Sequence, residues 1–459
     1  MKLVLLWTDI LVWSLVIVLL LWLWVISRSP QIKKQWHTIF RSSIAMASST
    51  VLLFYLLFTL LDSIHLRLAL PLDTQNVQKS QEVVYESEMV SLLDLLFAHN
   101  IQNTERTYSA PFATVEYTSS IVVDENGITK KVRLPLKHVS TKENLVIESL
   151  FALGVGLIVS LSLVVLHIWW RERSRFMLAC KETWQGESDL PWRTAYVTFI
   201  VLVMAFTWLY MLSYSYHLLG TDKVGGDVLY QSFKSIRTGV LIGILTTLIM
   251  LPAAVILGVS AGLFGGWVDD VIQYLYTTLS SIPGVLLIAA GVLSMQVMMD
   301  NNPTWFETTL ERSDLRLLFL ILILGITSWT GLCRLLRAET LKISQMEFVT
   351  AAKAFGVSKL TIIRRHIVPN LMHIILISVV LDFSGLVLAE AVLSYVGVGV
   401  DPTMHSWGNM INQARLEMAR EPMVWWSLFS AFVFMFILVF AANLFSDRIQ
   451  TVLDPRNKV

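Results

Sequence analysis

Long apolar runs alternate with short polar segments along most of this chain. A helical run of about 20 residues is needed to cross a hydrocarbon core of about 30 Å. Nine runs meet this length, at residues 3–26, 42–61, 146–170, 194–215, 236–260, 271–297, 316–336, 371–395 and 424–445. The pattern predicts an all-α polytopic membrane protein with nine spans.

The longest polar stretch, residues 62–145, separates the second run from the third. Residues 112–123 and 128–136 are rich in β-branched and aromatic side chains, and Asp-Glu-Asn-Gly at 124–127 favours a hairpin turn between them. Residues 87–98 are typical of a short helix. We expect a small α+β insert, which either steadies a partner receptor or only fills space.

Lysine and arginine residues gather in the loops of one side, which fixes the expected orientation. They follow the first run (Arg28, Lys33, Lys34, Arg41), the third run (Arg171, Arg173, Arg175) and the seventh run (Arg334, Arg337, Lys342, Lys353, Lys359, Arg364, Arg365). Strict alternation puts these loops and the C-terminus in the cytosol and the N-terminus outside. The first run has no small-residue cleavage site and is expected to be a retained anchor.

These boundaries divide the chain into four predicted parts. They are an N-terminal helix pair at 1–61, an extracytoplasmic insert at 62–145, further spans at 146–215 and a core at 216–459 that contains a polar loop at 344–370.

Composition agrees with a membrane protein and excludes several activities. The chain is 55% hydrophobic, and 15% of its residues are charged against about 25% in typical soluble domains. Its net charge of +1 gives no indication of nucleic-acid binding, and its two cysteines imply no disulfide framework. No GxxxxGK[ST] sequence, metal-ligand cluster or nucleophile constellation is recognisable, so we expect a non-catalytic chain without a bound cofactor or metal.

The loop at 344–370 has the pattern of two short helices joined by a bend. Ser344 and Glu347 have the spacing of a capping box, which predicts a helix start near Gln345. Phe348, Ala352 and Phe355 recur at helical spacing and would form one apolar face.

The end of this first short helix is also marked in the sequence. Gly356 supplies a left-handed residue, and a second helix is expected after Ser358. Pro369 is expected where the chain turns back into the membrane at Leu371.

A glycine-rich segment precedes the fifth run. Gly220, Gly225 and Gly226 allow positive φ, while Asp222 and Asp227 are suited to capping the helices that follow. A membrane-surface turn is therefore expected. A calcium loop is the alternative, but the segment lacks the further oxygen ligands that such a site needs.

Two carboxylates occur in or near the eighth run. An ionised carboxylate in a span costs about 2.5 to 3.5 kcal/mol on insertion scales, so Asp382 and Glu390 should face protein or water. They line a translocation path, or they form a buried polar pair at a helix interface, or Glu390 reaches the outer surface.

The polar loop resembles the EAA motif of ABC importer permeases. That pattern is matched by Glu347, Ala351, Ala352, Gly356 and Pro369. The resemblance implies a pair of coupling helices, including Phe348 and Phe355, that sits in a groove of a cytosolic ATPase subunit. The alternative is an ordinary amphipathic connector in which Glu347 only caps its own helix.

Further motifs are similar to those of dipeptide and oligopeptide importer permeases of the C type. The segment LGTDKVGGDVL at 219–229 resembles the family's GTDxxGRD, in which Gly220, Thr221, Asp222 and Asp227 match and Gly226 replaces the arginine. The other matches are AGLFGGWVD at 261–269, SIPGVLL at 281–287, AEAVLSYVGVG at 389–399 and LDPR at 453–456. The resemblance covers about residues 220–456, and the spans before it exceed the family's usual single leading span.

This resemblance implies a type I ABC importer transmembrane domain in a bacterial inner membrane. The implied partners are two ATPase subunits that bind ATP and magnesium, a second permease subunit and an extracytoplasmic solute-binding protein. The expected function is import of peptides by alternating access. A secondary transporter or channel, an importer of nickel or another small solute, and a membrane-anchored sensor acting through the insert remain alternatives.

Overall fold

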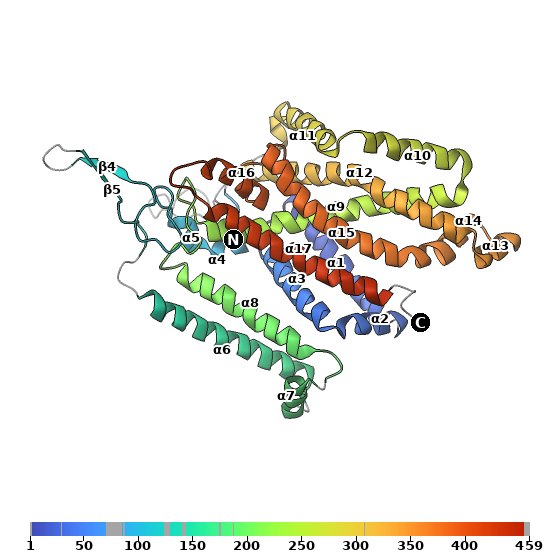
Figure 1. Cartoon of the computed structure of the whole chain (residues 1–459), viewed down its shortest axis with the longest axis horizontal. Helices are drawn as coiled ribbons and strands as arrows, with labels where there is room; N and C mark the ends of the chain where they lie inside the picture. Colours follow the sequence, from blue (N-terminus) through green and yellow to red (C-terminus); the bar gives the residue numbers. More distant parts are fainter. Residues whose placement is uncertain are drawn as a thin grey trace, which may run out of the picture. The chain divides into compact units, whose positions relative to one another are not determined.

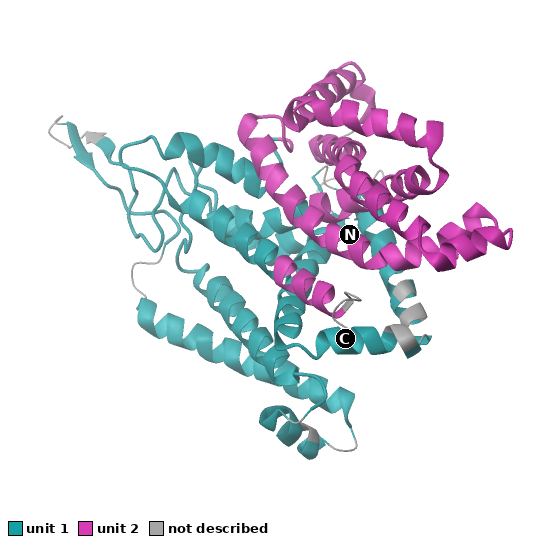
Figure 2. Ribbon diagram, turned by 45° about the vertical axis from the view of Figure 1, so that its right-hand side comes forward, with its two compact units in different colours: residues 1–239, 402–441 teal, residues 240–401, 442–459 magenta. Residues whose placement is uncertain are grey.

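The computed structural model describes residues 2–28, 30–69, 85, 88–123, 129–139, 144–173, 176–186, 188–306 and 308–453 (Figure 1). The chain divides into two compact units, coloured separately in Figure 2. Unit 1 comprises residues 1–239 and 402–441, and unit 2 comprises residues 240–401 and 442–459. Helices α9 (Val228–Phe264) and α17 (Trp426–Leu453) each contribute residues to both units.

Unit 1 begins with a strand rather than with a helix. The predicted first run starts at residue 3, but Lys2–Val4 forms β1 and pairs antiparallel with β2 (His65–Arg67), which in turn pairs with β3 (Val90–Ser91). Helix α1 (Trp7–Arg28) begins where the Asp9 carboxylate accepts a hydrogen bond from the Leu6 amide at 3.2 Å. This local bond fixes the helix start four residues later than predicted. Helices α2 (Pro30–Phe40) and α3 (Ser43–Asp62) follow.

The insert combines short helices with strands, as the sequence predicts. Its helices are α4 (Leu92–Leu96) and α5 (Ala98–Gln102), and its hairpin pairs β4 (Ser120–Val123) with β5 (Thr129–Val132). These strands are shorter than the predicted ones, and Figure 1 shows the hairpin projecting from the insert. The predicted turn at 124–127 lies outside the described residues.

Helices α6 (Leu145–Arg171) and α8 (Trp192–Leu212) form an antiparallel hairpin joined by α7 (Phe176–Gln185), as Figure 1 shows. The buried face of α6 carries Ala152, Gly156 and Ser160 at intervals of four residues. Small residues at this spacing let two helices approach closely in lipid. Gly156 confirms this, because a Cβ there would lie 3.1 Å from the Met204 Cα on α8.

Unit 2 contains α10 (Gly266–Ser281), α11 (Gly284–Asp300), the short turn Pro303–Trp305, α12 (Thr309–Ser344), α13 (Glu347–Ala354), α14 (Lys359–Ile362), the π-helical turn Ile363–Ile367 and α15 (Val368–Val396). Its core packs α9, α12 and α15 together around Met250, Leu336 and Leu371. In unit 1, α16 (Trp407–Glu417) precedes α17.

The predicted span at 271–297 is not one straight helix. It is replaced by α10 and α11, which meet at an angle of 87°. Ile282 precedes Pro283 and has extended backbone (φ −88, ψ 131), because proline disfavours the helical conformation in the residue before it. The Ile-Pro pair therefore breaks a segment whose hydropathy alone resembles a continuous span.

Seven described helical segments are long and apolar enough to cross a membrane, and an eighth crossing follows if α10 and α11 count together. The seven are Ser43–Asp62, Leu145–Arg171, Trp192–Leu212, Val228–Phe264, Thr309–Ser344, Lys359–Val396 and Trp426–Val452. The described apolar stretch of α1, Trp7–Leu21, is shorter than these, so its crossing stays a prediction. The chain is a predominantly helical, multi-pass membrane protein.

Candidate functional site

Two regions carry the predicted functional residues, and each lies within one unit. The glycine-rich segment at 219–229 belongs to unit 1, and the predicted coupling loop at 344–370 belongs to unit 2.

The glycine-rich segment forms a tight turn that the Asp222 side chain closes. Its Oδ1 atom accepts hydrogen bonds from the backbone amides of Val224 (2.9 Å) and Gly226 (2.8 Å), and its Oδ2 atom accepts one from Gln231 (2.7 Å). Asp222 was predicted to cap a helix, but here it stabilises the turn itself. Gly225 follows with φ of 81°, so the chain turns there and no helix starts after Asp222.

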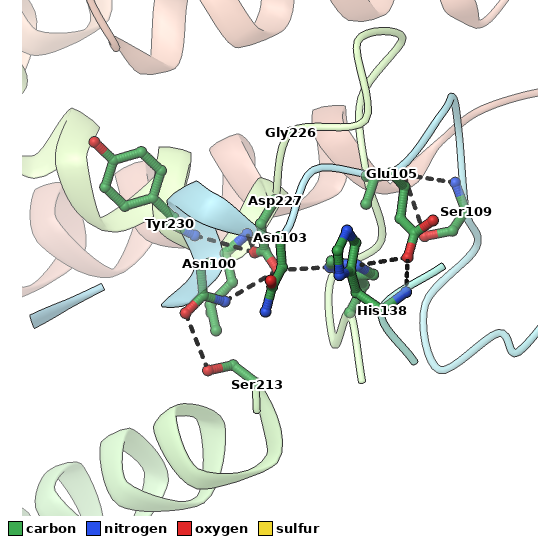
Figure 3. Close-up of polar contacts among 12 residues, drawn as sticks. Asn100, Asn103, Glu105, Ser109, His138, Ser213, Gly226, Asp227 and Tyr230 are labelled. Carbon is green, nitrogen blue, oxygen red and sulfur yellow. Dashed lines mark hydrogen bonds and ion pairs between the residues drawn. The ribbon is translucent and has the colours of Figure 1, made fainter. Parts of the chain in front are cut away.

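Asp227 caps α9, as the sequence predicts. Its Oδ1 atom accepts hydrogen bonds from the amides of Leu229 (2.8 Å) and Tyr230 (3.3 Å), which have no partner within the helix. Its Oδ2 atom accepts from Asn100 Nδ2 at 3.1 Å and lies 2.9 Å from His217 Nδ1 (Figure 3). One carboxylate therefore joins the start of α9 to helix α5 of the insert.

His217 lies between two carboxylates. Its Nε2 atom is 3.7 Å from Glu105 Oε1, on the side away from Asp227. Burial lowers the pKa of the imidazole, but the hydrogen bond to Asp227 and the charges of Asp227 and Glu105 outweigh burial and raise the pKa above its ordinary value. Glu105 also accepts the backbone amides of Lys137 and His138, both at 2.8 Å.

Two glycines allow the insert backbone to approach this turn. Gly220 and Gly225 have φ of 71° and 81°, as predicted, whereas the φ of Gly226 is not positive. A Cβ at Gly225 would lie 1.9 Å from the Glu105 carbonyl oxygen, and the Glu105 amide donates to the Gly225 carbonyl at 3.0 Å. No side chain can replace hydrogen at position 225 without separating these two segments.

Thr221 adds a further link. Its hydroxyl donates to the Thr107 carbonyl at 2.9 Å and accepts the Ser109 amide at 2.7 Å, while its own carbonyl accepts from Trp426 Nε1 at 2.9 Å. Thr221, Asp227 and the close backbone approach at Gly220 thus link the insert to the start of α9, whereas Asp222 closes the turn between them.

The charged residues further along α9 were not among the predicted site residues. Lys234 forms ion pairs with Asp62 (3.1 Å) and with Asp94, and Arg237 forms one with Asp9 at 2.8 Å. The sequence does contain a signal for these ion pairs. Lys234 and Arg237 lie near the start of a span, where a cation needs an anionic partner, and Asp9 and Asp62 lie near the ends of two other apolar runs. These pairs connect α9 to α1, α3 and α4.

The predicted coupling loop forms two short helices with an exposed apolar surface. Gly356 has φ of 74° and ends α13, and the Ser358 hydroxyl accepts the Thr361 amide at 3.4 Å to cap α14, as predicted. Phe348 is 43% exposed and Phe355 is 87% exposed. Ala352 is only half-buried and packs toward the core of unit 2, so the predicted face divides between core and surface.

Two predicted details of this loop are wrong: Ser344 and Glu347 form no capping box, and the first short helix starts at Glu347 and not near Gln345. Helix α12 continues through Ser344, whose hydroxyl donates to the Leu341 carbonyl at 2.8 Å, so no capping box forms and Met346 is the N-cap of α13. A hydroxyl inside a helix readily bonds a preceding carbonyl instead of an amide ahead of it. Glu347 is the first residue of α13, and Ala351 lies on its exposed side.

Pro369 also behaves differently from the prediction. The chain does not turn there, because helical structure runs from Lys359 to Val396. Proline cannot donate to the carbonyl four residues earlier and crowds it. A π-helical turn accommodates this, with the Val368 amide donating to the Ile363 carbonyl and Asn370 Nδ2 donating to the His366 carbonyl at 2.6 Å.

The two carboxylates of α15 have different surroundings. Glu390 is 1% exposed, and its Oε1 atom accepts a hydrogen bond from the Ser394 hydroxyl at 2.8 Å. Asp382 is half-buried. A role of either residue in a translocation path stays a prediction.

Comparison with known proteins places much of this chain in one transport family. Residues 254–459 match the family described as binding-protein-dependent transport system inner membrane component. The chain is 30% identical to the dipeptide transport system permease protein DppC of Bacillus subtilis over 240 residues, which are 52% of this chain and 69% of that protein. It is 31% identical to the oligopeptide permease OppC of Mycobacterium bovis, covering 53% of this chain and 77% of the relative.

A glutathione transport system permease, GsiD of Pectobacterium atrosepticum, is 30% identical over 53% of this chain and 74% of its own length. Among solved structures, the inward-facing MetNI methionine ABC transporter covers 49% of this chain and 95% of its own, with 17% identity and a TM-score of 0.37. The sequence matches cover enough of these permeases to establish the relationship. The chain belongs to the family of inner membrane components of binding-protein-dependent transport systems.

Proposed function

We propose that this chain is a transmembrane subunit of an ATP-driven importer of peptides. Family membership supports the permease assignment, and the relatives named for dipeptides, oligopeptides and glutathione support a peptide substrate. The observation that carries the proposal is the exposed apolar surface of the coupling loop. In this proposal ATP and magnesium bind to partner ATPase subunits, and a second permease subunit and a solute-binding protein complete the importer.

The coupling loop has the properties of a docking element. Phe355 and Leu360, at 87% and 76% exposure, lie on either side of the Gly356 bend, and Phe348 contacts His366 with its ring centroid 6.0 Å away. Large exposed apolar side chains gathered on a short element are typical of a partner interface. Figure 1 shows α13 and α14 at the end of the α12 and α15 helices, where a push on the loop acts directly on two spans.

This geometry supports a mechanism in which the loop transmits movement of the ATPase subunits to the spans. ATPase subunits that close on ATP would move the surface formed by Phe348, Phe355 and Leu360. Val349 is fully buried beneath that surface in the core of unit 2, so α13 would transmit the displacement to α12 and α15 rather than bend alone. Rocking of these spans would alternate access to a path at mid-membrane.

A matched pair of glycine substitutions tests the proposal. Gly356 and Gly186 have nearly equal φ values of 74° and 76°, and a Cβ at either meets nothing within 4 Å. Gly356→Val and Gly186→Val therefore carry a similar backbone penalty, and only the first lies in the coupling loop. We expect Gly356→Val to lower ATPase co-purification and peptide-stimulated ATP hydrolysis of the reconstituted complex by at least tenfold, with Gly186→Val near the parent.

Equal behaviour of the two variants would make the loop an ordinary connector and remove the support for ATP coupling. Substrate class is tested separately by peptide uptake into vesicles that contain the whole complex. Uptake of a peptide without ATP would instead assign a secondary transporter.

A further inference from the structure

Helix α2 is a short amphipathic helix between two apolar helices. It starts two residues after α1 ends and finishes three residues before α3 begins. Ile39 is 1% exposed, Trp36 and Phe40 are half-buried, and their rings stack with centroids 5.9 Å apart. Lys33 and Lys34 are both exposed. At helical spacing Lys34 lies opposite the apolar face, and Lys33 lies at its edge, one turn before Trp36. The helix is thus apolar on one face and cationic at the edge of that face and opposite it.

The segment that contains α2 carries a strong local positive charge. Residues 28–41 include Arg28, Lys33, Lys34 and Arg41 and contain no aspartate or glutamate. Among the described residues, neither lysine of α2 makes an ion pair. The neighbouring Arg28 guanidinium lies 3.8 Å from the centroid of the Trp24 ring, so its charge is held close to an exposed aromatic residue. An anionic partner would complement this surface.

The surroundings indicate that the partner is lipid and not protein. Exposed apolar side chains continue along α1 up to this helix, with Leu20, Leu23 and Trp24 each more than half exposed. On the predicted crossing of α1, this exposed surface next to α2 faces acyl chains. A helix with an apolar face and lysines at its edge and opposite it, lying at the end of such a surface, is suited to the headgroup layer.

We propose that α2 is an interfacial helix that binds anionic phospholipid headgroups through Lys33 and Lys34. Trp36, Ile39 and Phe40 hold the helix against α1, α3 and the acyl boundary, which fixes the two ammonium groups at headgroup level. A phosphatidylglycerol phosphate is the chemistry that two adjacent, unpaired ammonium groups recognise. The proposal does not depend on the transported substrate.

A second lysine pair in the chain provides a matched control. Lys130 and Lys131 are adjacent and exposed like Lys33 and Lys34, but they lie on β5 of the insert. The full chain is reconstituted in phosphatidylcholine nanodiscs with spin-labelled phosphatidylglycerol, and the motionally restricted fraction is measured by EPR at low and high salt. A cation near an anionic surface contributes about 1 kcal/mol, which is roughly a fivefold change in association for each lysine.

We expect K33Q/K34Q to lose most of the preference for phosphatidylglycerol at low salt, K33R/K34R to retain it, and K130Q/K131Q to match the parent. High salt should weaken the parent's preference. An unchanged preference in K33Q/K34Q, or an equal loss in K130Q/K131Q, would overturn the proposal. So would reduced ATPase co-purification by K33Q/K34Q with lipid preference intact, because that result assigns α2 to a protein partner.

Discussion

At the scale of single residues, the glycine-rich turn before α9 depends on the absence of a β-carbon at Gly225. Gly225 allows the Glu105 carbonyl to come within 1.9 Å of the position that a Cβ would occupy. The same contact places the Glu105 carboxylate beside His217 and the amides of Lys137 and His138. Gly226 stands where the motif that this segment resembles has an arginine, and Gln231 donates to the Asp222 carboxylate.

Alanine at position 225 should therefore destabilise the protein more than backbone strain alone explains. A left-handed conformation costs a residue with a β-carbon about 1 to 2 kcal/mol. Gly186→Ala bears only that penalty, since its φ is 76° and its surroundings are open. We expect the thermal unfolding midpoint in detergent to fall clearly further for Gly225→Ala than for Gly186→Ala. Similar midpoints would mean that the insert does not hold the turn.

His217 should make stability depend on pH in a defined direction. Its folded-state pKa lies above the ordinary value of 6.5, because Asp227 and Glu105 favour the imidazolium more than burial disfavours it. Its contribution is then complete below about pH 6.5 and is lost as pH rises through the folded pKa. Replacement by glutamine should remove this loss, so the difference in unfolding midpoint between parent and His217→Gln should shrink from pH 6 to pH 9. A difference that grows with pH would contradict the raised pKa.

At the scale of elements, seven of the nine predicted spans and the glycine bend of the coupling loop are confirmed, whereas the roles of the prolines were not predicted. Gly356 acts through its own positive φ, and Ser358 acts through one hydrogen bond of its hydroxyl. Both effects are local, so the positions of these residues in the sequence were enough to predict the bend and the start of α14. Pro283 and Pro369 have opposite outcomes, since the first separates two helices and the second stays inside one through a π-helical turn. The sequence does not distinguish them, because the packing of neighbouring helices decides whether a lost backbone hydrogen bond is replaced.

The buried network around His217 was not predictable for a related reason. Asn100 and Glu105 belong to the insert and are far in sequence from Asp227 and His217, so these residues come together only when the insert packs on the turn. Each of them alone resembles an ordinary polar residue of a surface loop.

The α6–α8 hairpin is a test of small-residue packing. A Cβ at Gly156 would lie 3.1 Å from the Met204 Cα and 3.2 Å from the Thr207 Cβ, whereas a Cβ at Gly154 meets nothing within 4 Å. Gly156→Leu should thus separate the helices at a cost of about 1 to 3 kcal/mol, and Gly154→Leu should be tolerated. The readout is the unfolding midpoint together with disulfide cross-linking of a cysteine pair placed across the hairpin. Equal cross-linking in both variants would show that α8 does not depend on this face.

At the scale of the whole molecule, the bent pair α10 and α11 decides the topology. Helix α11 has 17 residues, which is about 25 Å of helix at 1.5 Å per residue. This is slightly shorter than a hydrocarbon core of about 30 Å, so a complete crossing also needs the end of α10. Between α7 and the coupling loop the chain passes through α8, α9, the bent pair and α12. If the pair crosses, both loops lie on the same side of the membrane, and if it re-enters they lie on opposite sides.

Cysteine labelling distinguishes these topologies. In a background of Cys180→Ser and Cys333→Ala, single cysteines replace Gln185 after α7, Lys353 in the coupling loop and Lys131 in the insert, all of which are exposed. The cations near Gln185 and Lys353 place both in the cytosol under the positive-inside rule. We therefore expect a membrane-impermeant maleimide to label position 131 in intact cells and to reach positions 185 and 353 only after permeabilisation. Labelling of 353 but not 185 in intact cells would make the bent pair a re-entrant segment, and it would place the coupling loop where no cytosolic ATPase reaches it.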